Sequence, residues 1–140
     1  MARKKKIITF EKKSNQFEFK IEGLEDFEVT NVTRPMFEIK SGNITLSSFN
    51  VILKDISNPS LPHALMKWFA EQVTTENYVP RNATLKLFDT GGNVIEKWKY
   101  GRIRLMCINF NECAELTVSW SEDLYVSITC SCEEYELQSL

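Results

Sequence analysis

The clearest constraint on the fold is a strict alternation of apolar and polar side chains near the end of the chain. Between Leu124 and Glu133, every even-numbered residue is Leu, Val, Ile or Cys, and every odd-numbered residue is Tyr, Ser, Thr or Glu. A repeat of two residues is typical of a β-strand with one buried face, because successive strand side chains point to opposite sides. The segment therefore predicts a half-buried strand.

Weaker forms of the same alternation recur along the chain and predict a mainly β protein of about eight strands. A change of phase near Ser47 and Ser48 indicates a bulge or bend, and residues 89–93 have the composition of a hairpin turn. The order of elements lacks a strand–helix–strand rhythm, so we expect an antiparallel β-sandwich or barrel. The expected strands are 16–22, 27–33, 43–55, 84–89, 94–100, 102–108, 115–120 and 124–133.

One segment, 61–74, has helical rather than strand periodicity. Ser60 is suited to cap its first turn, and Pro62 fits within that turn. We therefore expect one α-helix packed on the β-structure, with its apolar stripe in the core. This stripe contains Leu61, Leu65, Trp68, Phe69 and Val73. Exposed aromatic rings can stack nucleic-acid bases, but periodicity favours core positions for Phe17, Phe19, Trp68, Phe69 and Trp120.

The length of 140 residues fits one domain, and 43% hydrophobic residues suffice for a core. The net charge of −2 hides an asymmetry. Residues 1–13 carry six basic groups and one acid, a net +5, whereas residues 111–140 carry seven acids and no Lys or Arg, a net −7. We divide the chain into a basic N-terminal arm, 1–13, and a single β domain, 14–140.

Ends of opposite sign suit electrostatic contacts within a subunit or between neighbouring copies. A nucleic-acid-binding arm and a solvated chain end are the alternatives for the basic segment. The isoelectric point near 5.5 makes the domain a poor reader of DNA sequence. Its apolar runs are far shorter than the roughly 20 residues of a membrane-spanning helix.

The residue patterns of common enzymes are missing, so we expect no catalysis, metal or cofactor. The single histidine, His63, has no nucleophile and orienting carboxylate near it in sequence. The five glycines do not form a phosphate-binding loop. Glu133 and Glu134 are adjacent on a strand, where they would point to opposite faces and form a solvated end rather than an acid–base pair.

Four cysteines lie in the C-terminal third of the chain. Their spacing differs from the paired C-x₂₋₄-C units of structural zinc sites. We expect reduced thiols, two of them buried as small core residues. A disulfide between Cys113 and the 130–132 segment is the alternative. The four residues are Cys107, Cys113, Cys130 and Cys132.

Five successive segments carry a family likeness. They are the strand 17–24, the strand ending in Val29-Thr30-Asn31-Val32-Thr33-Arg34-Pro35, an extended hairpin through 39–53, the helix around Ala64-Leu65-Met66-Lys67-Trp68-Phe69, and the closing strands 116–120 and 124–135. Together they resemble the tail tube proteins of contractile-tailed bacteriophages, over residues 16–137. The basic arm and the cysteines are not features of that resemblance.

The resemblance implies a structural subunit of a virion tail, assembled in the host cytoplasm. Such subunits form hexameric rings whose strands join into a continuous inner barrel, and the rings stack into a hollow tube. The implied partners are other copies of the chain, the tail sheath protein, and the tape-measure protein and DNA, which pass through the lumen without sequence-specific binding. No membrane is involved. Similar tubes of secretion systems and pyocin-like particles carry effectors or ions.

The resemblance also places subunit contacts on particular residues. The hairpin near 39–48 is similar to the family's inter-subunit arm, with a polar tip at Lys40, Ser41, Gly42 and Asn43. Charged candidates for contacts between copies are Lys4, Lys5 and Lys6 at one end and Glu133 and Glu134 at the other. A tube-terminating or baseplate ring and a monomeric β-sandwich binding module are the alternative functions.

Overall fold

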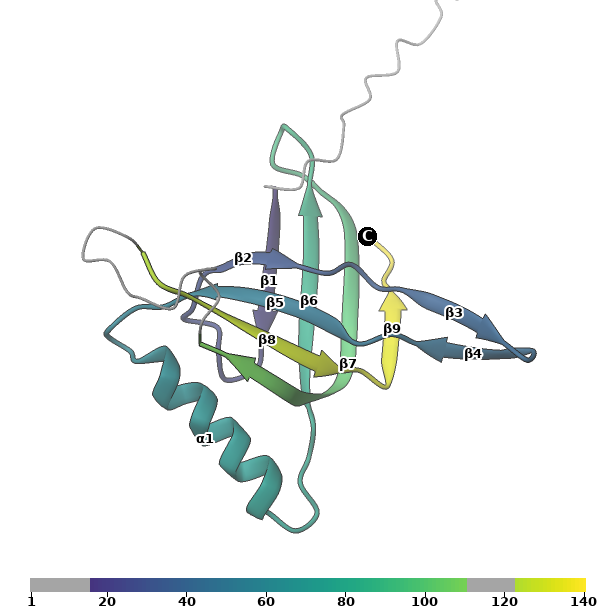
Figure 1. Cartoon of the computed structure of the whole chain (residues 1–140). Coiled ribbons are helices and arrows are strands. Elements are labelled where there is room, and N and C mark those ends of the chain that lie inside the picture. Colours follow the sequence, from purple (N-terminus) through teal and green to yellow (C-terminus); the bar gives the residue numbers. More distant parts are fainter. Residues whose placement is uncertain (1–15, 111–122) are drawn as a thin grey trace, which may run out of the picture.

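A computed structural model describes residues 16–110 and 123–140, and within them nine strands and one helix (Figure 1). The expectation of a mainly β chain with one helix is confirmed. The expected strand 115–120 lies outside the described residues. The elements are β1 (Phe17–Ile21), β2 (Val29–Val32), β3 (Phe37–Lys40), β4 (Asn43–Leu46), β5 (Phe49–Lys54), α1 (Leu61–Thr74), β6 (Arg81–Phe88), β7 (Val94–Asn109), β8 (Tyr125–Ser131) and β9 (Glu134–Leu137).

Seven of the strands form one folded antiparallel sheet in the order β1-β6-β7-β8-β5-β2, and β9 also pairs with β7. We call β1, β6, the first part of β7 and β9 sheet A, and the second part of β7 with β8, β5 and β2 sheet B. In Figure 1 the strands of sheet B cross in front of those of sheet A. Among the described residues β1 and β2 do not pair, so the structure is a sandwich and not a closed barrel.

Strand β7 joins the two sheets, and the expectation of two separate strands here is wrong. The chain runs unbroken through Gly101 and bends at Arg102, whose φ is 55°. Before the bend β7 pairs with β6 and β9, and from Arg104 onward it pairs with β8, while Ile103 still pairs with Arg81 of β6. Gly101 serves a close approach rather than a turn, because a Cβ there would lie 2.9 Å from a carboxylate oxygen of Glu134.

The core lies between the two sheets and contains a cluster of aromatic rings. The Phe49 and Tyr100 ring centroids are 4.8 Å apart, and those of Tyr100 and Tyr135 are 5.0 Å apart. Phe19 completes the cluster from sheet A, 5.1 Å from Tyr100. All are edge-to-face contacts, which aromatic pairs favour. The cluster ties β1, β5, β7 and β9 together.

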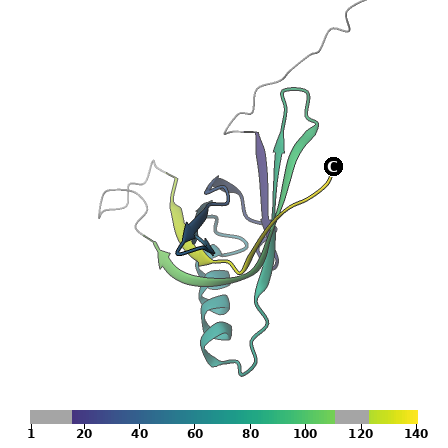
Figure 2. The ribbon, with the colours of Figure 1, turned by 90° about the vertical axis from the view of Figure 1, so that its right-hand side faces the viewer.

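Helix α1 has the predicted bounds and lies at one end of the sandwich, below the sweep of β7 (Figure 2). The Ser60 hydroxyl accepts a hydrogen bond from the His63 backbone N–H at 3.4 Å, as predicted for the cap. Leu61, Leu65 and Trp68 are buried. The expectation of core positions for Phe69 and Val73 is wrong, because the helix packs on the sheets along a narrow stripe and leaves both exposed.

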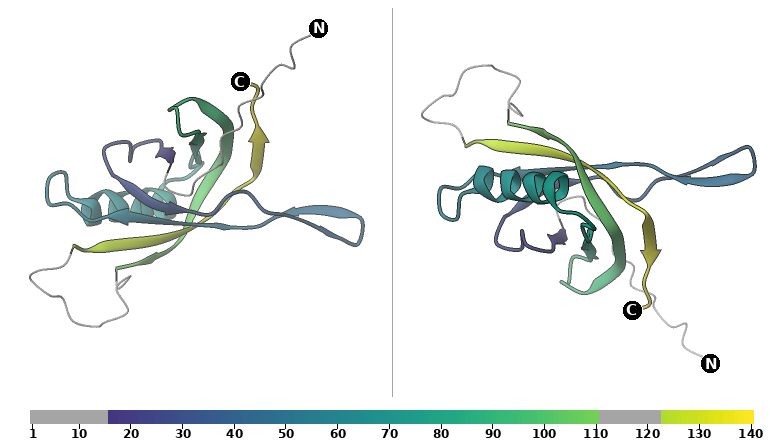
Figure 3. Two further views of the ribbon diagram at one scale, coloured as in Figure 1. Left: turned by 90° about the horizontal axis from the view of Figure 1, so that it is seen from above. Right: turned by 90° about the horizontal axis from the view of Figure 1, so that it is seen from below.

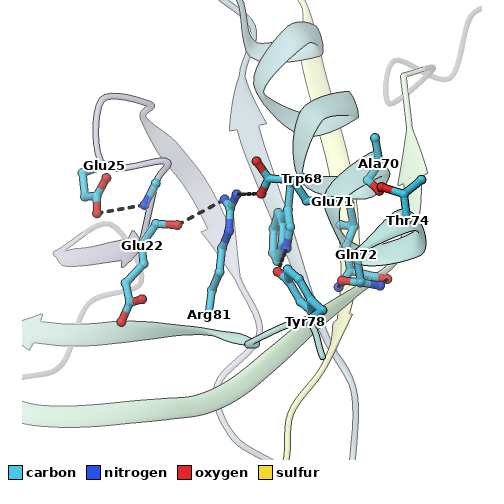
Figure 4. Close-up of polar contacts among 11 residues, drawn as sticks. Glu22, Glu25, Trp68, Ala70, Glu71, Gln72, Thr74, Tyr78 and Arg81 are labelled. Atoms are coloured by element: carbon cyan, nitrogen blue, oxygen red, sulfur yellow. Dashed lines mark hydrogen bonds and ion pairs between the residues drawn. The ribbon is translucent and has the colours of Figure 1, made fainter. Parts of the chain in front are cut away.

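Polar contacts fix the helix to the loop that follows it (Figure 4). The Trp68 indole N–H donates to the Tyr78 hydroxyl at 2.6 Å, and the Arg81 guanidinium lies 4.6 Å from the centre of the Trp68 ring. At the far side, the Gln72 amide exchanges two hydrogen bonds with the backbone of Leu105, at 2.7 and 2.8 Å. Gln72 thus satisfies the backbone N–H and C=O of Leu105, next to the register shift in the pairing of β7 with β8.

Candidate functional site

The β3–β4 hairpin projects from the sandwich and most of its residues are exposed (Figure 1, Figure 3). Its two strands pair only with each other, in a register that places Lys40 opposite Asn43. The turn residues Ser41 and Gly42 have φ angles of 51° and 78°. Two consecutive positive φ angles are typical of the two-residue turn that matches strand twist. The predicted polar tip is therefore a well-formed turn.

One face of the hairpin is apolar. Phe37 pairs with Leu46, and Ile39 pairs with Ile44. Toward the tip these side chains are open to solvent, because Ile39 is 77% exposed and Ile44 is 70% exposed. A solitary two-stranded hairpin is at best marginally stable in water, and a contiguous exposed apolar patch usually marks an interaction site. The hairpin therefore has the chemistry of a surface that another molecule covers.

The opposite face of the hairpin is polar. It carries Glu38, Lys40, Asn43 and Thr45, and the Lys40 ammonium lies 3.3 Å from the Glu38 carboxylate. Sequence reasoning named the tip alone and missed the apolar face. The signal was available, since apolar and polar residues alternate on both sides of Ser41-Gly42.

The base of the hairpin is anchored by two tyrosine hydroxyls. Tyr135 donates to the Ser47 carbonyl at 2.6 Å, and Tyr100 donates to the Thr33 carbonyl at 2.8 Å. Desolvation by burial raises the pKa of both phenols above the ordinary value of 10. Both groups therefore stay protonated at neutral pH and keep donating. The segments that lead into and out of the hairpin are thus each hydrogen-bonded to a strand of sheet A.

A buried carboxylate holds the same base from the other side. Both oxygens of Glu96 lie within 2.7 Å of the Arg34 guanidinium, and one accepts from the Trp98 indole N–H at 2.9 Å. The Phe37 ring packs 5.7 Å from Tyr135 and 6.3 Å from Trp98. Charge-assisted and aromatic contacts together fix the direction in which the hairpin projects.

The structure does not bring the other predicted contact residues to the hairpin tip. Glu133 pairs with Arg102 at 2.5 Å, and Glu134 opens β9 with its side chain folded over Gly101. Both glutamates are exposed, as predicted for a solvated pair, although Glu134 begins the paired strand β9. Lys4, Lys5 and Lys6 lie outside the described residues.

Of the two cysteines predicted to be buried, Cys130 lies in the core, whereas Cys132 is only partly buried and packs against it. Cys107, Cys130 and Cys132 are free thiols, and burial raises the pKa of Cys130 to about 12. Cys113 lies outside the described residues. In the described ranges we find no group of three potential metal ligands and no helix long and apolar enough to cross a membrane. His63 is exposed at the start of α1.

Solved structures that share this fold include the following three. A chain of an extracellular contractile injection system, the PVC sheath–tube complex in the extended state, is 14% identical with a TM-score of 0.59 over 95% of each chain. A chain of the anti-feeding prophage tube-terminating cap is 12% identical with a TM-score of 0.58, covering 98% of this chain and 97% of that chain. A chain of the six-fold symmetrised anti-feeding prophage baseplate is 8% identical with a TM-score of 0.60, covering 94% and 97%.

No family model and no curated protein matches the sequence. The structural matches confirm, at the level of the fold, the likeness to tail tube proteins. The matched chains come from a sheath–tube complex, a tube-terminating cap and a baseplate.

Proposed function

We propose that the chain is a tail tube subunit that forms six-membered rings, which stack into a hollow tube. The observation that carries the proposal is the rigidly based hairpin with Ile39 and Ile44 exposed at its end. A second copy would bury this face and supply the core that the hairpin lacks. A head-to-tail contact of this kind closes into rings or grows into filaments, depending on the rotation between copies. Ring size six rests on the family likeness.

The cargo and outer partners follow from the same proposal. DNA would pass through the lumen behind the tape-measure protein, a tail sheath would surround the tube, and assembly would take place in the host cytoplasm before incorporation into the virion tail. Phosphate binding depends on Lys and Arg contacts, so a channel face of mixed charge would let DNA slide. The oppositely charged segments 1–13 and 111–140 would help to set the stacking direction.

The test compares two single substitutions at sites of equal exposure. Ile39 and Val79 are both 77% exposed, but Val79 lies in the loop between α1 and β6, away from the hairpin. We expect Ile39→Asp to abolish rings and tubes in negative-stain electron microscopy across a concentration series, because a charge cannot be buried unpaired. Val79→Asp should assemble like the unaltered protein. Discrete monomers of the unaltered protein at every concentration would refute the proposal.

A tube-terminating or baseplate ring is the second candidate, because structures of both kinds share the fold. The same electron microscopy separates it from a tube subunit. A tube subunit grows into filaments of uniform width as its concentration rises, whereas a terminating ring stops at single or paired rings. In either case Ile39→Asp should prevent rings, because the proposed hairpin contact must form before a ring can stack into a filament.

A further inference from the structure

The two end strands of the main sheet, β1 and β2, do not pair with each other. Among the described residues β1 pairs only with β6, and β2 pairs only with β5. A strand that is paired on one side leaves alternate backbone N–H and C=O groups on its other edge without a strand partner. The seam between β1 and β2 is therefore a place where the sandwich can accept a further strand.

A groove of about 270 Å³ lies in this seam, and one of its walls is apolar. That wall consists of Phe17 from β1 and Leu85 and Leu87 from β6. Both leucines are buried, and Phe17 is partly buried. A cavity of about 150 Å³ with a lining of this kind binds a benzene ring. The groove thus has room for one aromatic ring together with an aliphatic side chain.

The other wall of the groove is the edge of β2. Thr30, Asn31 and Val32 all line it. Because successive strand residues point to opposite faces, a groove that contacts three of them in a row runs along the edge of the strand. An occupant would meet apolar side chains on one wall and backbone hydrogen-bonding groups on the other. A short apolar strand uses both walls, as in the addition of a peptide strand to a sheet edge.

The sequence just before β1 supplies such a strand. Ile7-Ile8-Thr9-Phe10 is an apolar run between the basic residues 3–6 and 12–13. Isoleucine, threonine and phenylalanine are all favoured in strands. Residues 11–15 can span at most about 18 Å, and loops of up to five residues commonly reverse a chain. The chain can therefore turn back from Phe17, which itself lines the groove.

The short connection also favours the run of the same chain over that of a second copy. A short flexible tether holds a segment near its site at an effective concentration in the millimolar range. At micromolar protein the tethered run is therefore the stronger competitor for the groove. The basic residues 3–6 would stay outside the groove, because unpaired charges are costly to bury.

We propose that residues 7–10 occupy this groove as an additional strand along the free edge of β2. Ile8 and Phe10 pack against Leu85 and Leu87, and Thr9 points away from the groove with Asn31. The added strand covers the edge of β2 and joins the two sheets at the seam. The inference concerns the single chain and does not rest on the proposed ring.

The first experiment measures proximity by cross-linking below the concentration of assembly. In a Cys107→Ser, Cys113→Ser background, Thr9→Cys combined with Asn31→Cys is treated with a short bis-maleimide linker and digested for mass spectrometry. We expect an internal link in the monomer, formed several times more efficiently than in the matched pair Thr9→Cys with Thr84→Cys. Thr84 lies on the outward face of sheet A, away from β2. Both pairs retain Cys130 and Cys132, so reaction at these thiols is controlled.

Equal linking of the two pairs would overturn the proposal, because a segment that samples all positions reaches both. Linked dimers in place of linked monomers would assign the groove to a second copy and overturn the proposal as stated.

The second experiment measures stability by urea denaturation of the monomer. Ile8→Asp and Phe10→Asp should each lower the urea midpoint by about 1 M, since each removes buried apolar surface. Thr9→Asp is the matched control, because it adds the same charge to the same segment on the side away from the groove and should leave the midpoint unchanged. Equal midpoints for the three variants would overturn the proposal. Ring formation enters neither measurement, so the proposed function is tested separately.

Discussion

Strand β8 and the β3–β4 hairpin share a sequence pattern and differ in what covers it. In β8 the apolar positions Val126, Ile128 and Cys130 are at most 1% exposed, because sheet A lies across them. In the hairpin the corresponding positions Ile39 and Ile44 are 77% and 70% exposed. Alternation therefore specifies a strand with an apolar face, but it does not specify where the covering surface comes from.

The apolar side chains of β8 therefore contribute to the free energy of folding, whereas those of the hairpin contribute to the free energy of assembly. Burial in β8 contributes to the stability of the single chain, at roughly 25 cal/mol for each Å² of apolar surface removed from water. The same surface in the hairpin contributes nothing to monomer stability until a partner covers it. Substitutions in β8 should thus mainly lower the free energy of unfolding, whereas substitutions in the hairpin should mainly impair assembly.

The largest expected effect on monomer stability comes from truncation in β8. Ile128 pairs with Val51 and Ile108 and is buried, so Ile128→Ala should lower the free energy of unfolding by about 2–4 kcal/mol through lost burial and a residual cavity. Ile44→Ala removes the same atoms from the hairpin and should change it by less than about 0.5 kcal/mol. Urea denaturation at a concentration below assembly measures both. Equal losses would contradict the division between the two regions.

A smaller effect is expected where the hairpin joins the sandwich. Tyr135→Phe removes the hydrogen bond to the Ser47 carbonyl and should cost about 1 kcal/mol at neutral pH. Burial raises the pKa of Tyr135 and Tyr100 in the folded state. The stabilisation is therefore fully present below the unfolded-state pKa, about 10, and is lost as the pH rises above it.

The free energy of unfolding measured from pH 8 to pH 11 tests this linkage. The unaltered protein should lose stability steeply above about pH 10, and Tyr135→Phe should make the decline shallower because one raised pKa has been removed. Tyr125→Phe is the control, since Tyr125 is on the outward face of β8 and makes no such anchor. An unchanged slope in Tyr135→Phe would show that this phenol does not drive the alkaline loss.

Much of the fold could be predicted from local sequence patterns. The bounds of α1 could be predicted because cap, first-turn proline and periodicity agree, and the break between β4 and β5 was visible as a change of phase at Ser47-Ser48. The course of β7 could not be predicted. Gly101 resembles a turn signal, and only the side chain of Glu134, far away in sequence, shows why glycine is needed there.

The site was less predictable than the fold because its parts are held by non-local contacts. The tip at Lys40–Asn43 was located, but the anchor from Arg34 to Glu96 spans 62 residues and leaves no local signature. Strand β9 was missed for a related reason. Its sequence alternates acidic and apolar residues over only four positions, and pairing with β7 makes it a strand.

The smallest expected effect on monomer stability comes from the hairpin turn, and it separates folding from assembly most cleanly. Gly42 has a φ of 78° with open space around it, so Gly42→Ala strains the turn without a collision. Positive φ costs a non-glycine residue about 1 kcal/mol, but the hairpin makes few contacts with the sandwich beyond its base. Unfolding of the monomer should therefore change by only a few tenths of a kcal/mol, while rings require a several-fold higher concentration because the arm must be formed before it can dock. Gly101→Ala is the contrast, since Gly101 is buried in β7 and the added Cβ would lie 2.9 Å from a carboxylate oxygen and 3.1 Å from the Cβ of Glu134, which should lower the unfolding free energy itself. If Gly42→Ala assembled normally, the formed turn would not be a requirement for the contact between copies.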